Sequence, residues 1–303
     1  MTPVSGTIGP TPHGEDASQQ GTVQMNAAER WTQALAAWAI PPAILAAAPE
    51  SPWGFPTELF ERRADAVPAE PTPSTQRALE ALPEGGVVLD VGCGAGAASL
   101  PLAARAGRLI GVDPSAEMLQ AFRRRVEATG TAVTTLEGTW PSVAEQTPVA
   151  DVVVCHHVAY NVPDLAPFVQ RLTDHARVRV VMELTAQHPM SALNDLWRHF
   201  HDLARPTTPT ADDAVAVLQE VGLAPERVAW EAPAPGWFSP FTRREDLVAW
   251  VRRRLCLPAE RDGEIEAALG ARVLEREGSV GLPPRPVVTL WWNGAAPAPD
   301  RAG

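Results

Sequence analysis

Residues 87–96 read Val-Val-Leu-Asp-Val-Gly-Cys-Gly-Ala-Gly, a mostly apolar run that ends in three closely spaced glycines. A short run rich in valine predicts a buried strand, and the glycines predict a tight turn after it. Residues 97–106 are predicted to form a helix that opens from this turn. Glycines let a ligand lie against the backbone, and a helix N-terminus adds unpaired N–H groups. This stretch therefore predicts a ligand site at the carboxyl end of a strand.

The chain beyond residue 75 alternates strand-like and helix-like segments, which is typical of a mostly parallel sheet with helices on both faces. The pattern predicts a doubly wound α/β fold with seven strands. Strands are predicted near 86–91, 108–112, 132–137, 150–155, 178–184, 226–232 and 286–292. Helices are predicted near 75–82, 96–106, 115–129, 164–175, 211–221, 243–256 and 260–275, with an additional helical piece over 190–204 after the fifth strand.

The N-terminal part of the chain differs in composition from the rest. Residues 1–24 are rich in Thr, Pro, Gly, Ser and Gln, which predicts a disordered tail. Asn26 and Glu29 then form a capping-box pattern in front of Trp31, Leu35 and Trp38, which predicts an amphipathic cap helix. The predicted division is a tail over 1–24, a helical cap and connector over 25–74, a main domain over 75–295 with an insertion over 186–210, and a flexible C-terminus over 296–303.

Charge and cysteine content exclude several classes of partner. The 303 residues include 25 basic and 36 acidic side chains, a net charge of -11 that disfavours nucleic acid and anionic membrane surfaces. No run reaches the roughly 18 consecutive apolar residues of a membrane helix, and no secretory signal is expected. Cys93, Cys155 and Cys256 are odd in number and lack a C-x-x-C spacing, so we expect no disulfide framework and a cytoplasmic location. The sequence makes no prediction of oligomeric state.

A second acidic residue narrows the class of ligand that this site can bind. Asp113 follows the second predicted strand, 21 residues after Gly92 (113 − 92), where a carboxylate can bind the hydroxyls of a ribose. Because position 97 is Ala, the glycine turn also satisfies the dinucleotide fingerprint G-x-G-x-x-G/A. A nicotinamide-dependent dehydrogenase therefore stays an alternative at this point.

The two motifs together, L-D-V-G-C-G-A-G over 89–96 and G-V-D-P-S-A-E-M-L over 111–119, resemble the class I S-adenosylmethionine-dependent methyltransferases. The resemblance covers about residues 75–185 closely and implies a Rossmann-like fold with S-adenosyl-L-methionine as cofactor. It places the glycines against the amino-acid part of the cofactor and Asp113 on its ribose. Thr139 stands where the family commonly has an adenine-binding acid, so Trp140 is the expected stacking partner. The cofactor-binding residues implied are Asp90, Gly92, Gly94, Gly96, Asp113, Pro114, Thr139, Trp140 and His156.

The segment after the fourth strand carries the candidate catalytic residues. It reads His156-His157-Val158-Ala159-Tyr160-Asn161, and ligands of open α/β sheets bind at the carboxyl ends of strands. Histidine titrates near neutrality and can accept a proton from a hydroxyl or amine. We therefore predict His157 as general base, His156 as a wall of the cofactor pocket and Tyr160 as a substrate-orienting residue; the alternative is that the histidines are packed or solvated structural residues. His199 and His201 are further candidates; the histidine spacings predict no metal site.

The loop after the fourth strand also limits the substrate class. It lacks the Asn/Asp-Pro-Pro-aromatic turn typical of enzymes that methylate amino groups of nucleic acids or glutamine. The chain is thus predicted to methylate an oxygen or nitrogen of a small organic molecule. The alternatives are a non-catalytic S-adenosylmethionine-binding protein and the dehydrogenase. The aromatic residues that can cover the substrate are Trp53, Phe55, Trp197, Phe200, Trp237, Phe238 and Phe241; the alternative for each is packing in the core.

Overall fold

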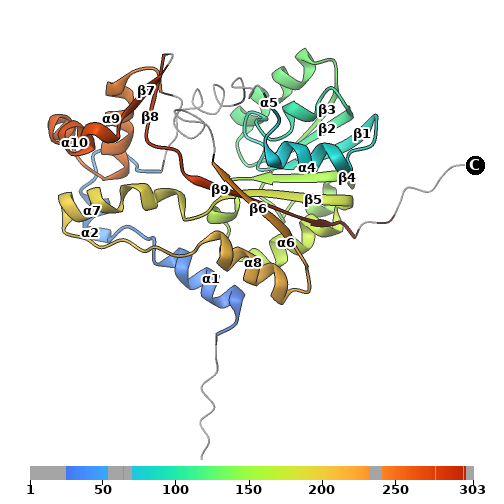
Figure 1. Ribbon diagram of the computed structural model, residues 1–303, viewed down its shortest axis with the longest axis horizontal. Coiled ribbons are helices and arrows are strands. Elements are labelled where there is room, and N and C mark those ends of the chain that lie inside the picture. The colour runs from blue at the N-terminus through green and yellow to red at the C-terminus, as the bar shows by residue number, and fades with distance from the viewer. Residues whose placement is uncertain are drawn as a thin grey trace, which may run out of the picture.

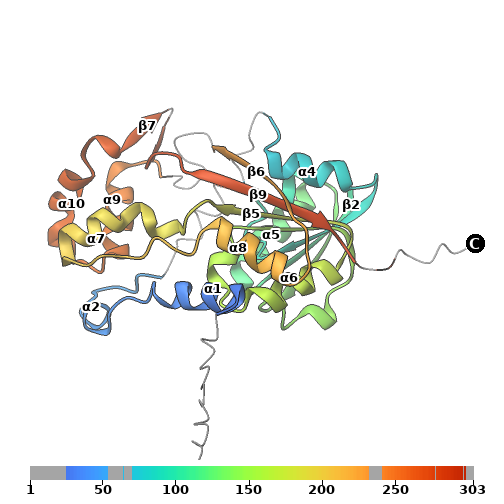
Figure 2. The same cartoon turned by 60° about the horizontal axis from the view of Figure 1, so that its bottom comes forward.

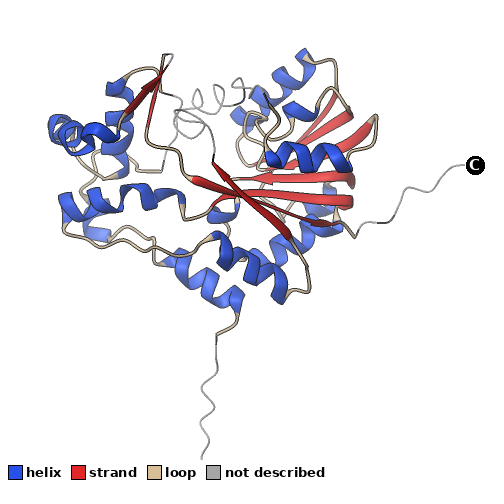
Figure 3. Cartoon of the chain, viewed as in Figure 1, coloured by secondary structure: helices blue, strands red, loops and turns tan. Residues whose placement is uncertain are grey.

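A seven-stranded sheet with helices on both faces forms the main body of the protein (Figures 1 and 3). The computed structural model describes residues 25–53, 64, 70–231, 241–276, 278–295 and 297, and within them the strand order is β3-β2-β1-β4-β5-β9-β6. β9 is antiparallel to both of its neighbours and the other pairs are parallel. The predicted doubly wound, mostly parallel sheet is confirmed. Its strands are β1 (Gly86–Val91), β2 (Ala106–Asp113), β3 (Ala132–Glu137), β4 (Ala150–His156), β5 (Ala176–Thr185), β6 (Glu226–Glu231) and β9 (Pro286–Asn293).

Side-chain alternation along the strands builds a core on each face of the sheet. In β1, Leu89 and Val91 face one cluster while Val88 faces the other, as the two-residue period of a strand requires. The first face is covered by α1 (Ala27–Ala36), α6 (Leu165–Asp174) and α8 (Ala211–Glu220), and the second by α4 (Pro73–Ala81) and α5 (Ala116–Ala128) (Figure 2). No helix in the described part of the chain is long and apolar enough to cross a bilayer.

The N-terminal cap packs onto the loops that follow β4 and β5. The predicted capping box is present, because Asn26 Oδ1 accepts from the Glu29 N–H at 2.8 Å and Glu29 accepts from the Asn26 N–H at 3.0 Å. Trp31 is fully buried, and its indole N–H donates to the Val162 carbonyl at 2.8 Å. Trp38 lies just past the helix end and stacks on His188 with ring centroids 3.9 Å apart. The cap is therefore anchored at the edge of the sheet where the candidate catalytic residues lie.

The helix predicted over residues 97–106 does not form. The chain there makes turns and a short 3-10 piece, Leu100–Leu102, before β2 begins at Ala106. Pro101 explains the difference, since it has no N–H to donate and its ring crowds the preceding turn of an α-helix. The other 3-10 pieces are Ala144–Gln146, Ala159–Asn161, Pro189–Leu193, Ala259–Arg261 and Gly270–Arg272.

A smaller lobe lies beside the sheet, at the left of Figure 1, with a core of its own. The predicted insertion supplies α7 (Asn194–His201), residues 241–281, which enter between β6 and β9, supply most of the rest, and the N-terminal cap adds residues 40–48. The predicted helix over 260–275 ends early at Leu269 and a hairpin follows it. The other elements of the lobe are α2 (Pro42–Ala46), α9 (Arg244–Arg254), α10 (Asp262–Leu269), β7 (Leu274–Arg276) and β8 (Ser279–Gly281).

Some of the predicted features lie outside the described residues. These are the tail over 1–24, the aromatic residues Phe55, Trp237 and Phe238, and the flexible C-terminus predicted over 296–303, apart from residue 297. Of the other aromatic residues expected to cover the substrate, Trp197 and Phe241 are buried in the smaller lobe, where Phe200 packs against them half-buried, and Trp53 is exposed.

Candidate functional site

The glycine turn follows β1 and is hydrogen-bonded to the carboxyl end of the neighbouring strand β2. Gly92, Gly94 and Gly96 all have positive φ, at 71°, 51° and 101°, a region that other residues rarely adopt. The N–H groups of Gly92 and Cys93 donate to the Val112 carbonyl at 2.8 and 3.1 Å. A side chain at position 92 would place its Cβ 2.4 Å from Val158, in the loop after β4. The turn thus needs glycine both for its backbone and for the close approach of the next loop.

Asp113 ties the end of β2 to the glycine turn. Its Oδ2 accepts from the Gly94 N–H and its Oδ1 from the Ser115 N–H, each at 2.9 Å. Each carboxylate oxygen keeps further acceptor capacity, and the residue is only half-buried. Pro114 is exposed beside it, and Ser115 caps α5. The carboxylate is therefore held rigidly with acceptor positions left for ligand hydroxyls.

Asp90 is a buried acid whose hydrogen bonding is incomplete in the described part of the chain. Its side chain accepts from the Ser99 hydroxyl at 2.6 Å through Oδ2, while the buried Oδ1 has no hydrogen-bond partner there. Burial is the main cause that raises the pKa of Asp90 to about 7; repulsion from Asp113 adds to it and the Ser99 bond opposes it. Buried polar atoms are almost always hydrogen-bonded. An unsatisfied acid oxygen beside a glycine cradle fits a ligand that brings a positive charge or an N–H group.

The turn after β3 lies next to Asp113, at the carboxyl end of the neighbouring strand β2. The Gly138 N–H donates to the Asp113 carbonyl at 3.1 Å, and Thr139 follows it at the surface. Trp140 is 8% exposed, packs edge-on against His175 and donates its indole N–H to the Phe168 carbonyl at 3.3 Å. This packing disfavours the stacking role predicted for Trp140, whereas Thr139 lies where a ligand can reach it.

His156 and His157 meet at one buried carboxylate. His157 Nε2 lies 2.6 Å from Glu183 Oε1, and His156 Nδ1 lies 3.9 Å from Glu183 Oε2. The histidine side chains are 11% and 12% exposed, and that of Glu183 is 1% exposed. β4 and β5 run in parallel with His156 opposite Glu183, so the carboxyl ends of the two strands bring the three side chains together.

The carboxylate of Glu183 is held ionised by its neighbours. Burial by itself raises the pKa of this group, but the charge of His156, the contact with His157 and a hydrogen bond from Ser74 hold the pKa well below its usual range. The Ser74 hydroxyl donates to Glu183 Oε2 at 2.6 Å. Sequence reasoning missed Glu183 and Ser74. The available signal was an acid inside the apolar run Val180–Leu184, the same signal that marked Asp90.

Tyr160 lies in the core rather than at an open surface. Its hydroxyl donates to the Thr185 carbonyl at 2.7 Å and its ring stacks on Trp31 with centroids 5.6 Å apart. Burial is the main cause that raises the pKa of Tyr160 well above its usual range. These contacts favour an anchoring role between cap and sheet and disfavour the predicted role in orienting substrate.

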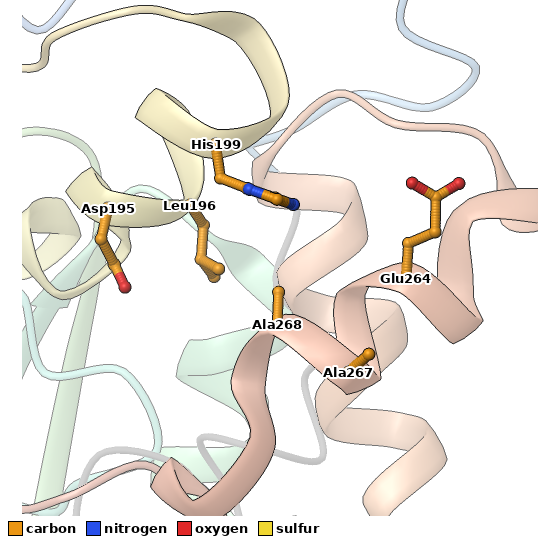
Figure 4. A pocket seen from close by; sticks show the side chains of 6 residues that line it. All are labelled: Asp195, Leu196, His199, Glu264, Ala267 and Ala268. Atoms are coloured by element: carbon orange, nitrogen blue, oxygen red, sulfur yellow. The ribbon is translucent and has the colours of Figure 1, made fainter.

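The remaining candidate histidines belong to the smaller lobe. A cleft of about 550 Å³ between α7 and α10 is lined by His199 together with Asp195 and Glu264 (Figure 4). His201 on the same helix contacts the Leu255 carbonyl through Nε2 at 2.7 Å. The cleft takes in no predicted cofactor residue. Among the described residues, no group of three or more His, Cys, Asp or Glu side chains is arranged to hold a metal ion.

Comparisons with known proteins find methyltransferases. Residues 88–178 match the family described as a methyltransferase domain. A probable cobalt-precorrin-6B C(15)-methyltransferase (decarboxylating) from Pyrobaculum calidifontis is 39% identical over 105 residues, which cover 32% of this chain and 53% of that protein. The ubiquinone biosynthesis O-methyltransferase of Photorhabdus laumondii is 41% identical over 78 residues, which cover 25% of this chain and 32% of that protein. Residues 88–178 thus carry a methyltransferase domain of the kind found in class I S-adenosylmethionine-dependent methyltransferases.

A solved structure shows how far the likeness of fold extends. The YcgJ protein of Bacillus subtilis superposes with a TM-score of 0.50 at 18% identity, over 74% of this chain and 98% of that protein. At this identity the likeness concerns the fold. The chain spans about half the length of the first curated relative and about a third of the second.

Proposed function

We propose that the chain transfers the methyl group of S-adenosylmethionine to an oxygen or nitrogen atom of a small organic molecule. The observation that carries the proposal is the pairing of His157 with the ionised carboxylate of Glu183 beside the glycine turn. Val158, the residue after His157, lies so close to Gly92 that no side chain fits between them. A candidate base and a candidate cofactor cradle therefore share one edge of the sheet.

The described residues suit the cofactor in distinct ways. Asp90 offers a buried acceptor for the positively charged amino group, the glycine turn lets the amino-acid part lie against the backbone, and Asp113 offers its carboxylate to the ribose hydroxyls. S-adenosylmethionine supplies a methyl group activated by a sulfonium charge. The chain itself must orient the acceptor, which can lower a barrier by up to ~7–11 kcal/mol, and remove its proton. His157 is the residue proposed for the second task.

The class of acceptor follows from chemistry and charge. An imidazole base is useful when the nucleophile is a hydroxyl or amine that loses a proton, and a net charge of -11 disfavours polyanionic substrates. One relative is named a C(15)-methyltransferase and the other an O-methyltransferase, so the relatives leave the acceptor atom open. We include a cytoplasmic location in the proposal, since all three cysteines are buried and unpaired.

The test uses the full chain with methyl-labelled S-adenosylmethionine and a fractionated small-molecule extract, with mass spectrometry of whatever becomes labelled. His157→Asn is the matched negative control. His157 has a φ of 60°, and Asn tolerates this backbone region while supplying no base. Labelled product that depends on His157 supports the proposal. Tight cofactor binding without transfer to any fraction supports the non-catalytic alternative, and preferential binding of NAD contradicts the proposal.

A further inference from the structure

Glu183 lies where an acid is costly unless it is fully partnered. It occupies the middle of the buried run Val181–Thr185 of β5, with 1% of its surface exposed. Taking a carboxylate out of water costs several kcal/mol unless opposite charges and hydrogen bonds compensate. Val or Leu would fill this strand position without that cost. The position of Glu183 therefore calls for a role beyond packing.

A chain of hydrogen bonds converges on this carboxylate from three other elements. The Trp230 indole N–H of β6 donates to Thr289 Oγ1 of β9 at 2.9 Å, and Thr289 lies 2.7 Å from the Ser74 hydroxyl of α4. Ser74 in turn donates to Glu183 Oε2 at 2.6 Å. Because an indole can only donate and a carboxylate can only accept, each proton in the chain points toward Glu183. Ser74 and Thr289 are fully buried, so the chain of donors is shielded from water.

Glu183 also holds His157 at two separate points. The His157 backbone N–H donates to the Glu183 carbonyl at 2.7 Å, and its ring Nε2 lies 2.6 Å from the carboxylate. The backbone of His157 is in the left-handed region, with φ at 60°. Non-glycine residues in that region persist only where surrounding contacts impose it, and they cluster at active sites. Both the ring and the main chain of His157 are thus set by Glu183.

We propose that Glu183 is the positioning residue of the methyl-transfer site, which fixes the proton of neutral His157 on Nε2 and presents Nδ1 to the methyl acceptor. Ser74 and Thr289 keep the carboxylate in place. This inference rests on the proposed function, because it takes His157 as the base.

In the reaction the acceptor oxygen or nitrogen bonds to the methyl carbon and the carbon–sulfur bond breaks, its electron pair staying on sulfur. The acceptor proton passes to His157 Nδ1 and from there to water.

The first test needs no substrate. Nitrogen-15 NMR of the imidazole rings in the full-length protein identifies the tautomer of each histidine, and His157→Asn assigns the His157 signals. The inference predicts the Nε2–H tautomer for neutral His157 in the wild-type protein. It also predicts that Glu183→Gln moves the His157 titration to lower pH by at least about one unit, because the protonated ring loses its counter-charge. Glu80→Gln, an exposed ion-paired glutamate of α4, is the matched control and should leave the titration unchanged.

The outcomes separate the inference from the function it rests on. An Nδ1–H tautomer in the wild-type protein overturns the inference, and this measurement does not depend on whether Glu183→Gln folds. With the acceptor found by labelling, Glu183→Gln should lower kcat about 10²-fold, with KM for S-adenosylmethionine within about twofold. Full turnover in Glu183→Gln contradicts the inference and leaves methyl transfer intact. Failure of the wild-type protein to bind S-adenosylmethionine contradicts the proposed function, whatever the histidine signals show.

Discussion

Replacing Asp90 with Asn should make the ligand-free protein more stable at alkaline pH while it weakens cofactor binding. Asp90 is 1% exposed and accepts one hydrogen bond, from Ser99 at 2.6 Å. Burial is the first cause that raises its pKa from 3.8 to about 7. The folded protein therefore disfavours the charged form of Asp90. The free-energy cost of ionising Asp90 in the folded state can be measured as a dependence of the free energy of unfolding on pH.

The sign and size follow from the difference between the two pKa values. Because the pKa of Asp90 is higher in the folded chain, its contribution to stability is fully present below pH 3.8 and is lost as pH rises through about 7. Between pH 5 and the folded-state pKa of about 7 lie about two pH units over which the wild-type protein loses this stabilisation; above pH 7 little more is lost. At 1.36 kcal/mol per unit it loses about 2–3 kcal/mol. Asn is neutral throughout, has the same shape and can still accept from Ser99, so Asp90→Asn escapes this loss.

Urea denaturation of the ligand-free protein at pH 5 and pH 8 measures the effect. The free energy of unfolding of Asp90→Asn, relative to wild type, should rise by about 2–3 kcal/mol from the lower to the higher pH. Glu117→Gln, on the exposed first turn of α5, controls for the loss of one negative charge. Calorimetry should show at least tenfold weaker S-adenosylmethionine binding by Asp90→Asn. An equal difference between variant and wild type at both pH values would refute the assignment of Asp90 as a strained acid.

Three further changes probe the site and the cap. Gly92→Ala should lower the free energy of unfolding by about 1–3 kcal/mol, since φ is 71° and the new Cβ meets Val158 at 2.4 Å; an unchanged urea midpoint contradicts this. Asp113→Ala should weaken S-adenosylmethionine binding at least tenfold by calorimetry, because a hydrogen bond to a charged acceptor contributes ~1.5–3 kcal/mol, and unchanged affinity removes Asp113 from the site. Burial chiefly lowers the pKa of His188 from 6.5 to about 3, so stability is lost as pH falls below 6.5. Between pH 7.5 and 5.5 the wild-type protein should lose about 1.4 kcal/mol that His188→Asn does not lose, and parallel urea curves would contradict it.

The sheet was predictable from sequence because each strand is short, apolar and bounded by turn residues. All seven predicted strands correspond to strands of the sheet, to within two residues at either end. Local pattern was enough to predict α1 as well, because the capping box of Asn26 and Glu29 spans only four consecutive residues. The helix predicted over residues 97–106 does not form because Pro101 interrupts it, although the apolar periodicity of that stretch favours a helix.

The site was only half predictable, and the missing half depends on contacts between distant segments. Glycines, Asp90 and Asp113 follow each other within 24 residues and carry a recognisable spacing. Glu183 and Ser74 are 109 residues apart, and no local rule pairs a serine on a helix with an acid on a strand. The smaller lobe was not predicted for the same reason. Its core joins α7 to residues 241–281, and two elements of the main domain, α8 and β6, lie between these segments in the sequence.

Two buried acids, Asp90 and Glu183, show how neighbours decide the role of a carboxylate. Both are 1% exposed on strands of one sheet, so burial opposes ionisation in each. Asp90 has one hydroxyl donor and a second acid, Asp113, near it, and its pKa rises to about 7. Glu183 has two histidines and Ser74, and its pKa falls well below the usual range. An acid with spare acceptor capacity and a pKa near neutrality gains most when a cationic ligand arrives, whereas an acid already ionised holds a histidine in one orientation. In the proposed site, two acids 93 residues apart (183 − 90) thus have different roles: Asp90 binds the cofactor, and Glu183 positions the histidine that accepts the proton.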